Sequence, residues 1–277
     1  MSTNRFQLVG SLLRPKNLLD YKDQIQGRDD ITYPFYEDFE GYQEIETKEA
    51  KDIIAKQIAE NIDVITDGEF TRSMWHLDFL WGFDGVERYI ADKGYQFKDH
   101  DGSSFETRKD IGVKITRPIS GKNHHFNELF KQTKNEAGNH EVKLTIWGPA
   151  HAFTELTVFN QTSGIGDVYQ NADELKVGLI NAYKEFLEDY AQAGGTIIQL
   201  DDCLWELFSE DNEQGFVAAG VENVEQLADD FIAINNEIAD YAHELGLKAW
   251  THNCRGNYES RHMAGGSYES IAEKFLK

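Results

Sequence analysis

The sequence has 277 residues, and 27 Lys and Arg against 49 Asp and Glu give a formal net charge of −22 at pH 7. That acidity argues against nucleic acids or anionic membrane surfaces as partners, because binding phosphate needs clustered basic side chains. Hydrophobic residues at 40% and aromatic residues at 12% supply enough apolar surface for a packed core. We therefore expect a soluble protein whose partners are small molecules.

The chain start and the cysteine content bear on the compartment. The first residues contain no apolar segment of the secretory type, and nowhere do about 18 apolar residues follow one another. The two cysteines, Cys203 and Cys254, are too few for a disulfide scaffold. These features predict a cytoplasmic protein without a membrane partner.

One structural unit recurs along the chain, consisting of an amphipathic helix, a glycine, and a short apolar strand that ends in polar residues. The apolar spacing predicts helices over residues 47–61, 173–193 and 224–245. Short apolar runs predict five strands, at residues 6–12, 62–66, 142–147, 196–200 and 247–251. Helices that alternate with short strands are typical of parallel βαβ units in an α/β fold.

Residues 89–140 interrupt this pattern with a polar stretch that is rich in Gly and Lys. One β-like run, residues 112–119, lies within it, and His124 and His125 follow in what we interpret as a loop. We interpret the stretch as an insertion with a hairpin inside a single catalytic domain over residues 1–277. The two histidines are expected to be solvated and not to bind a metal.

Polar residues follow every predicted strand, and the strand ends carry Ser11, Asp67 and Glu69, Gly148-Pro149, Asp201 and Cys203, and His252 and Cys254. In a parallel barrel or doubly wound sheet, the carboxyl ends of the strands hold the active site. The alternative is that these residues are polar only because βα loops lie at the surface.

His252 and Cys254 are the sharpest candidates for metal binding. Side chains at positions i and i+2 of a strand project to one face, so both can reach one ion. Imidazole and thiolate together suit Zn²⁺ and make up half of a tetrahedral ligand set. The alternative is a buried cysteine beside a hydrogen-bonded histidine. Cys203 could bind a stray metal ion, but we expect it to be a small buried hydrophobic residue.

Glu69 and Asp201 are candidates for binding a substrate ammonium group or for acting as a general base. The alternative for each is a helix cap or a surface acid, and Asp67 and Asp202 are expected to have such capping or supporting roles. Ser11 follows a glycine at a strand end, where backbone N–H groups and a hydroxyl could bind a carboxylate. A plain turn is the alternative there.

Taken in order, these segments resemble the C-terminal catalytic domain of cobalamin-independent methionine synthase, and more narrowly its shorter single-domain bacterial relatives. The matching stretches span nearly the whole chain: Val9-Gly10-Ser11 with Leu13-Arg14-Pro15, Asp67-Gly68-Glu69 with Arg72, Gly148-Pro149, Gln199-Leu200-Asp201, and His252-Asn253-Cys254-Arg255-Gly256-Asn257.

The resemblance implies a (β/α)8 TIM barrel with zinc at its C-terminal mouth and methyl transfer to the thiolate of homocysteine, giving methionine. It implies that His252 and Cys254 bind Zn²⁺, that Glu69 and Asp201 hold the amino group of homocysteine, and that Ser11 binds its carboxylate. The family has an Asp-Glu-Pro run where this chain has Asp201-Asp202-Cys203. The methyl donor, of the folate type or another, stays open.

The number of strands in the family bears on how much of the barrel we expect here. The family barrel has eight strands, and its other zinc ligands, a glutamate and a second cysteine, lie on later strands than the five predicted here. We therefore expect a barrel that is truncated after about five βα units. Three alternatives to this methyltransferase stay open, namely a uroporphyrinogen decarboxylase-like enzyme, a corrinoid or other thiol methyltransferase, and a non-catalytic amino-acid-binding homologue.

Overall fold

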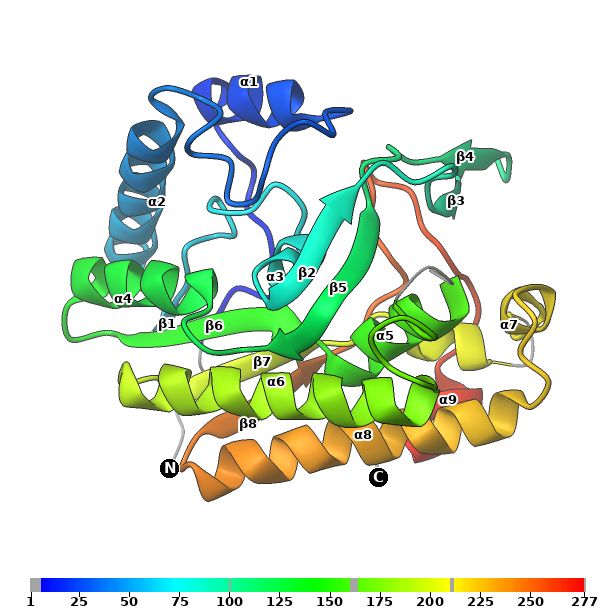
Figure 1. The fold of residues 1–277 in the computed structure, drawn as a ribbon. Helices are drawn as coiled ribbons and strands as arrows, with labels where there is room; N and C mark the ends of the chain where they lie inside the picture. Colours follow the sequence, from blue (N-terminus) through cyan, green and yellow to red (C-terminus); the bar gives the residue numbers. More distant parts are fainter. Residues whose placement is uncertain (1–5, 100, 160–163, 210–211, 277) are drawn as a thin grey trace.

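A parallel sheet forms the centre of the computed structural model, which describes residues 6–99, 101–159, 164–209 and 212–276 (Figure 1). Its four strands lie in the order β1-β6-β7-β8. They are β1 (Val64–Ile65), β6 (Glu141–Trp147), β7 (Ile197–Asp201) and β8 (Lys248–His252). All neighbouring pairs are parallel, as the sequence predicts.

The predicted strand over residues 6–12 is wrong, because only Gln7 pairs with the sheet, through one parallel bridge to Val64. Side chains on the polar face of the sheet bind the main chain that follows this bridge. Lys143 Nζ donates to the carbonyl of Leu8 (2.6 Å), and Gln199 Nε2 donates to that of Val9 (2.9 Å). These bonds occupy carbonyl groups that would otherwise be available to a longer ladder.

Helices α4 (His125–Ala137), α6 (Ala172–Gln192) and α8 (Val224–Glu244) cover one face of the sheet (Figure 1). The predicted helices at 173–193 and 224–245 match α6 and α8 closely. Asn side chains cap both N-termini. Asn171 accepts a hydrogen bond from the N–H of Glu174, and Asn223 accepts one from the N–H of Gln226, each with a length of 3.0 Å. The predicted helix over 47–61 is the larger part of α2 (Tyr42–Ala59).

The remaining elements are short. They are α1 (Lys16–Ile25), α3 (Leu77–Trp81), α5 (Pro149–Thr154), a π-helical turn (Glu155–Phe159), a 3₁₀ turn (Trp205–Phe208), α7 (Gln214–Ala218) and α9 (Glu269–Phe275). Two antiparallel strand pairs complete the fold: β2 (Asp84–Tyr89) pairs with β5 (Gly112–Ser120), and β3 (Gln96–Lys98) pairs with β4 (Ser104–Glu106).

The polar stretch 89–140 is therefore less uniform than the sequence indicates. The run 112–119 is a strand, as predicted, but its partner β2 begins before the stretch, at Asp84. The last part of the stretch is α4, which contacts β6, α2 and α6 and belongs to the helical layer. Phe126, Leu129 and Phe130 form its buried face.

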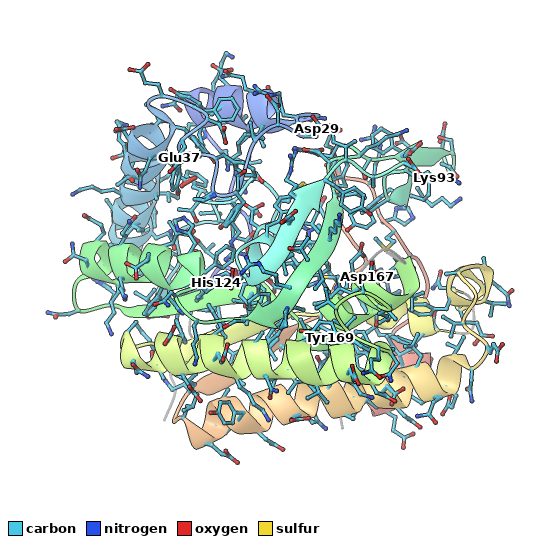
Figure 2. All side chains as sticks on the ribbon, viewed as in Figure 1. Asp29, Glu37, Lys93, His124, Asp167 and Tyr169 are labelled. Carbon is cyan, nitrogen blue, oxygen red and sulfur yellow. The ribbon has the colours of Figure 1, made fainter. Side chains whose placement is uncertain are left out.

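His124 is buried at the start of α4 (Figure 2), so its expected exposure to solvent is wrong. Its Nδ1 accepts the N–H of Phe126 (3.1 Å) and caps the helix, and its Nε2 lies 2.8 Å from the carbonyl oxygen of Phe79. Burial lowers the pKa of His124 to about 3. The residue is thus a neutral helix cap in the core.

Side chains of the strands alternate between the helix-covered face and an opposite, polar face. Ile146, Ile198 and Leu200 are buried on the apolar side, whereas Lys143, Thr145 and Gln199 are buried on the other. Among the described residues the parallel strands form an open sheet, with β8 at one edge. This arrangement is consistent with part of a TIM-barrel-like fold. No described helix is long and apolar enough to cross a bilayer.

Close packing of α6 on the segment after β5 yields a stability prediction. A Cβ at Gly121 would lie 1.9 Å from the carbonyl oxygen of Ala182 in α6. Gly121→Ala should therefore lower the free energy of unfolding by about 1–3 kcal/mol, measured by urea denaturation. Gly215→Ala is the control, because a Cβ there meets open space in a helix and should be neutral or stabilising. Equal stability of the two variants would contradict this packing.

Candidate functional site

The carboxyl ends of β7 and β8 bring two cysteines and a histidine together. The two strands pair in register up to Asp201 and His252. Cys203 and Cys254 each follow this pair by two positions, and their Sγ atoms lie 3.2 Å apart. The ligand atoms of Cys203, His252 and Cys254 all lie within 4.8 Å of one another. The three side chains are half-buried.

Cys203 therefore does not have the purely hydrophobic role that the sequence predicts, because its sulfur faces the predicted pair His252 and Cys254. The sequence held a signal for this placement. Asp201-x-Cys203 and His252-x-Cys254 have the same spacing after consecutive strands, and parallel strands end at the same edge. His151 Nδ1 accepts the N–H of Cys203 (3.3 Å) and helps to hold that loop.

Charges within this cluster favour a thiolate at Cys254. The hydrogen bond with Cys203, and after it the contact with His252, lowers the pKa of Cys254 to about 4 against the opposing effect of burial. The same sulfur accepts the N–H of Gly256 (3.4 Å). The pKa of Cys203 is raised by the hydrogen bond with Cys254 and by burial. The pKa of His252 is raised, chiefly by its hydrogen bond with Cys254 and also by Asp201.

A tight turn after β1 positions Glu69. Gly68 and Glu69 both have left-handed backbone, with φ of 66° and 57°, which is uncommon for a residue other than glycine. Asp67 Oδ1 accepts the N–H of Glu69 (2.9 Å), and Thr71 Oγ1 donates to Asp67 Oδ2. Asp67 thus has the supporting role that the sequence predicts, and the turn is held by side-chain bonds.

Glu69 is buried, at 3% exposure, and each oxygen of its carboxylate has a protein partner. Ser11 Oγ donates to Oε2, and Thr145 Oγ1 donates to Oε1 (2.9 Å). Arg72 Nη1 forms an ion pair with Oε1 at 3.4 Å. Arg14 Nη2 also donates to the Glu69 main-chain oxygen (2.6 Å). The structure therefore brings the two predicted residues Ser11 and Glu69 into contact, beside a buried arginine.

Asp201 is also buried, at 4% exposure, but it belongs to no ion pair within the described part of the chain. Gln199 Nε2 donates to its Oδ1 (2.6 Å), and Lys143 Nζ donates to the amide oxygen of Gln199 (2.7 Å), which fixes that amide. Burial and the nearby Glu69 raise the pKa of Asp201 to about 7. Two carboxylates thus share one region in which only Glu69 has an arginine partner.

Asp202 has the supporting role that the sequence predicts. Its Oδ2 accepts the indole N–H of Trp205 (2.8 Å) and the amide of Asn235 in α8. Gly148, at the predicted Gly-Pro end of β6, donates its N–H to the carbonyl of Asp201 (2.8 Å). A Cβ at Gly148 would lie 3.0 Å from that same oxygen. These contacts fix the backbone on which Asp201 and Cys203 lie.

Several residues of this network carried no predicted role: Arg72, Lys143, Thr145 and Gln199. Arg72 and Gln199 lie within the sequence motifs, but a motif does not say which partners a side chain finds. Arg72 is only 1% exposed, and its Nη2 donates to Thr145 O (2.7 Å) and Oγ1 (2.8 Å). It therefore links the turn after β1 to β6.

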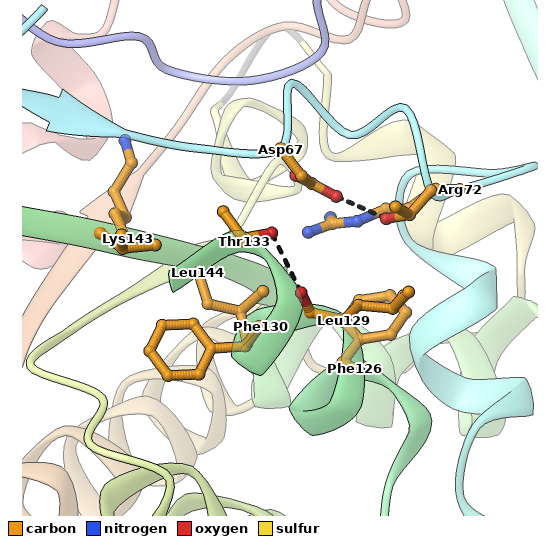
Figure 3. A pocket seen from close by; sticks show the side chains of 10 residues that line it. Asp67, Arg72, Phe126, Leu129, Phe130, Thr133, Lys143 and Leu144 are labelled. Atoms are coloured by element: carbon orange, nitrogen blue, oxygen red, sulfur yellow. Dashed lines mark hydrogen bonds between the residues drawn. The ribbon is translucent and has the colours of Figure 1, made fainter. Parts of the chain in front are cut away.

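A small pocket lies between α4 and β6, and Figure 3 shows its lining. Asp67, Arg72, Phe130 and Lys143 line it, and Cys203, His252 and Cys254 do not. Its volume of about 10 Å³ has room for about one water molecule. We interpret it as a packing gap behind the turn that carries Glu69.

Comparison with known proteins places the chain among relatives that are longer than it. It is 34% identical over 269 residues to the uncharacterized protein YxjH of Bacillus subtilis (strain 168) and 31% identical over 271 residues to YxjG of the same organism. Each match covers 97% of this chain and 66% of the relative. No family model matches the chain.

Two solved structures share the fold. One is a candidate vitamin-B12-independent methionine synthase from Listeria monocytogenes, with 29% identity, a TM-score of 0.63, and coverage of 92% of this chain and 68% of that one. The other is a B12-independent methionine synthase from Shewanella sp. W3-18-1 in complex with selenomethionine, with 19% identity, a TM-score of 0.57, and coverage of 92% and 63%.

Asp201 should make stability depend on pH. With its pKa raised to about 7, the folded state holds the proton more tightly than the unfolded state, whose pKa lies near 4. Burial of Asp201 therefore does not lower the free energy of unfolding below about pH 4, where the carboxyl is protonated in both states. Between pH 4 and 7 the loss of free energy of unfolding grows. Asp201→Asn should remove that cost and raise the free energy of unfolding at pH 8 by on the order of 1–4 kcal/mol.

Urea denaturation of the metal-free protein at pH 4.5 and pH 8 measures this difference. Asp240→Asn on the exposed side of α8 is the control. It should have the same effect on the free energy of unfolding at both pH values. An Asp201→Asn variant that loses stability at both pH values would contradict the electrostatic account.

Proposed function

We propose that this chain binds zinc and homocysteine in a methyltransferase that moves a methyl group to the homocysteine thiol, giving methionine. The observation that carries the proposal is the cluster of Cys203, His252 and Cys254, whose ligand atoms lie within 4.8 Å of one another at the ends of adjacent strands. The resemblance in sequence motifs supplies the identity of the substrate, and the methyltransferase neighbours support the reaction class.

The donor atoms of the cluster suit zinc. Two sulfurs and one imidazole nitrogen are ligands that Zn²⁺ prefers, and small side-chain rotations would bring all three within zinc bonds of about 2.0–2.3 Å. His252 and Cys254 are the ligands that the resemblance implies, and Cys203 is the third donor that this chain offers. Three protein ligands are typical of catalytic zinc sites, which leave a position for substrate. Zinc in this position would stabilise the substrate thiol as a nucleophilic thiolate at neutral pH.

Glu69, Asp201 and Ser11 are proposed to hold the amino-acid end of the substrate. Asp201 is a buried carboxylate without an ion-pair partner among the described residues, and an ammonium group would supply the missing cation. Such a partner favours the ionised carboxylate and so offsets the cost of its burial. Ser11 already donates to Glu69, so binding a substrate carboxylate requires its hydroxyl to rotate away.

We also make proposals for the methyl donor and for the complete barrel. We propose a methyl donor of the folate or corrinoid type, and the net charge of −22 disfavours a polyglutamate tail. We also propose that the parallel sheet is part of a single (β/α)8 domain. The antiparallel strand pairs β2 with β5 and β3 with β4 are insertions in this domain. The chain spans 66% of the length of the curated relative YxjH, and the remaining strands of such a barrel would lie in the further part of that length.

Zinc binding by the reduced full chain tests the metal site. We expect about one zinc per chain, and a loss of affinity of more than about tenfold in Cys254→Ser and in His252→Ala, measured by competition with a chromogenic chelator. His140→Ala is the matched control, because His140 is exposed and precedes β6 at the opposite end of the sheet. Equal affinity in all four proteins would rule out this site.

Calorimetry of homocysteine binding to the zinc-loaded chain tests the amino-acid site. Asp201→Asn should weaken homocysteine binding at least about tenfold while zinc content stays unchanged, because one charge-assisted contact is lost. Loss of zinc in that variant would place Asp201 among the metal ligands instead. Homocysteine binding without turnover with any methyl donor would favour the non-catalytic alternative.

A further inference from the structure

Cys203 and Cys254 follow the ends of neighbouring strands, and their thiols face each other. Parallel neighbours lie about 4.7–4.9 Å apart, and β7 and β8 pair up to Asp201 and His252. The N–H of Asp202 donates to the carbonyl of His252 (2.8 Å), so the chains stay together beyond the last strand residues. The spacing of neighbouring strands falls within the Cα separations of about 4.4–6.8 Å that disulfides span.

The two sulfurs are also close and accessible. Their separation of 3.2 Å has to shrink by only about 1.2 Å to reach a disulfide bond length. Both side chains are half-buried, so a small oxidant can reach them. The chain contains no other cysteine, and each sulfur therefore has a single partner available within the molecule.

We propose that Cys203 and Cys254 form a reversible oxidation site that hydroperoxides convert to an intramolecular disulfide. The Cys254 sulfur attacks one peroxide oxygen, the O–O bond breaks, and an alcohol or water leaves while a sulfenic acid forms. The Cys203 thiol then attacks that sulfur, the S–O bond breaks, and water leaves with the Cys203 proton. Two thiols are oxidised and one peroxide is reduced.

Oxidation and metal binding exclude each other at this site. A disulfide has no thiolate to offer, so the oxidised chain loses two of the three donors of the cluster. This consequence rests on the proposed function, whereas formation of the disulfide does not. Oxidation of the two thiols would therefore lower the zinc occupancy of the chain.

Thiol counting in the full chain tests the proposal. The metal-free protein is treated with a small excess of hydrogen peroxide, and its thiols are then counted by maleimide labelling and non-reducing intact-mass analysis. We expect both thiols to disappear together, a monomer mass lower by two hydrogen atoms, and recovery of both thiols with dithiothreitol. Cys203→Ser and Cys254→Ser, each checked for folding by circular dichroism, should form no internal link.

Three outcomes would overturn the proposal: both thiols survive, oxidation stops at sulfinic acid, or only links between chains form. A parallel sample saturated with zinc separates this proposal from the proposed function. A disulfide in a chain that binds no zinc would leave the oxidation site standing and remove the metal site. Zinc binding without any disulfide would do the reverse.

Discussion

The register between β7 and β8 is the constraint on which the candidate site depends. Because Asp201 lies opposite His252, the two positions that follow on each strand place Cys203 and Cys254 face to face. A shift by one residue would turn alternate side chains to the other face of the sheet and separate the sulfurs from the imidazole. The helices on the apolar face fix this register, since α8 packs on β8 and contacts α6.

The polar face of the sheet adds a second constraint, the balance of charge. Arg72 pairs with Glu69 (3.4 Å) and also bonds to Thr145, so the turn after β1 and strand β6 are joined through one buried cation. Among the described residues, the Asp201 carboxylate has an amide donor, Gln199, and no ion-pair partner. Since breaking a buried pair leaves an uncompensated charge, Arg72 keeps Glu69 in place, whereas the cation that we propose for Asp201 is the ammonium group of the substrate.

Much of the fold could be predicted from periodicity, because amphipathic spacing and Asn caps define helices such as α6 and α8 locally. Residues 6–12 could not, since their carbonyls bond to Lys143 and Gln199 from distant strands. The burial of His124 likewise depends on Phe79, which lies 45 positions earlier. For the site, the strand ends predicted Ser11, Glu69, Asp201, His252 and Cys254 as candidates, and their roles in binding stay predictions. Cys203 was missed as a donor because one sequence does not give strand register.

X-ray absorption at the zinc edge on the reduced, zinc-loaded full chain most directly tests whether Cys203, His252 and Cys254 bind zinc. We expect two sulfur ligands and at least one imidazole nitrogen, and we expect one sulfur ligand to be lost in Cys203→Ser. A zinc site without sulfur ligands, or one whose sulfur count does not change in Cys203→Ser, would contradict it.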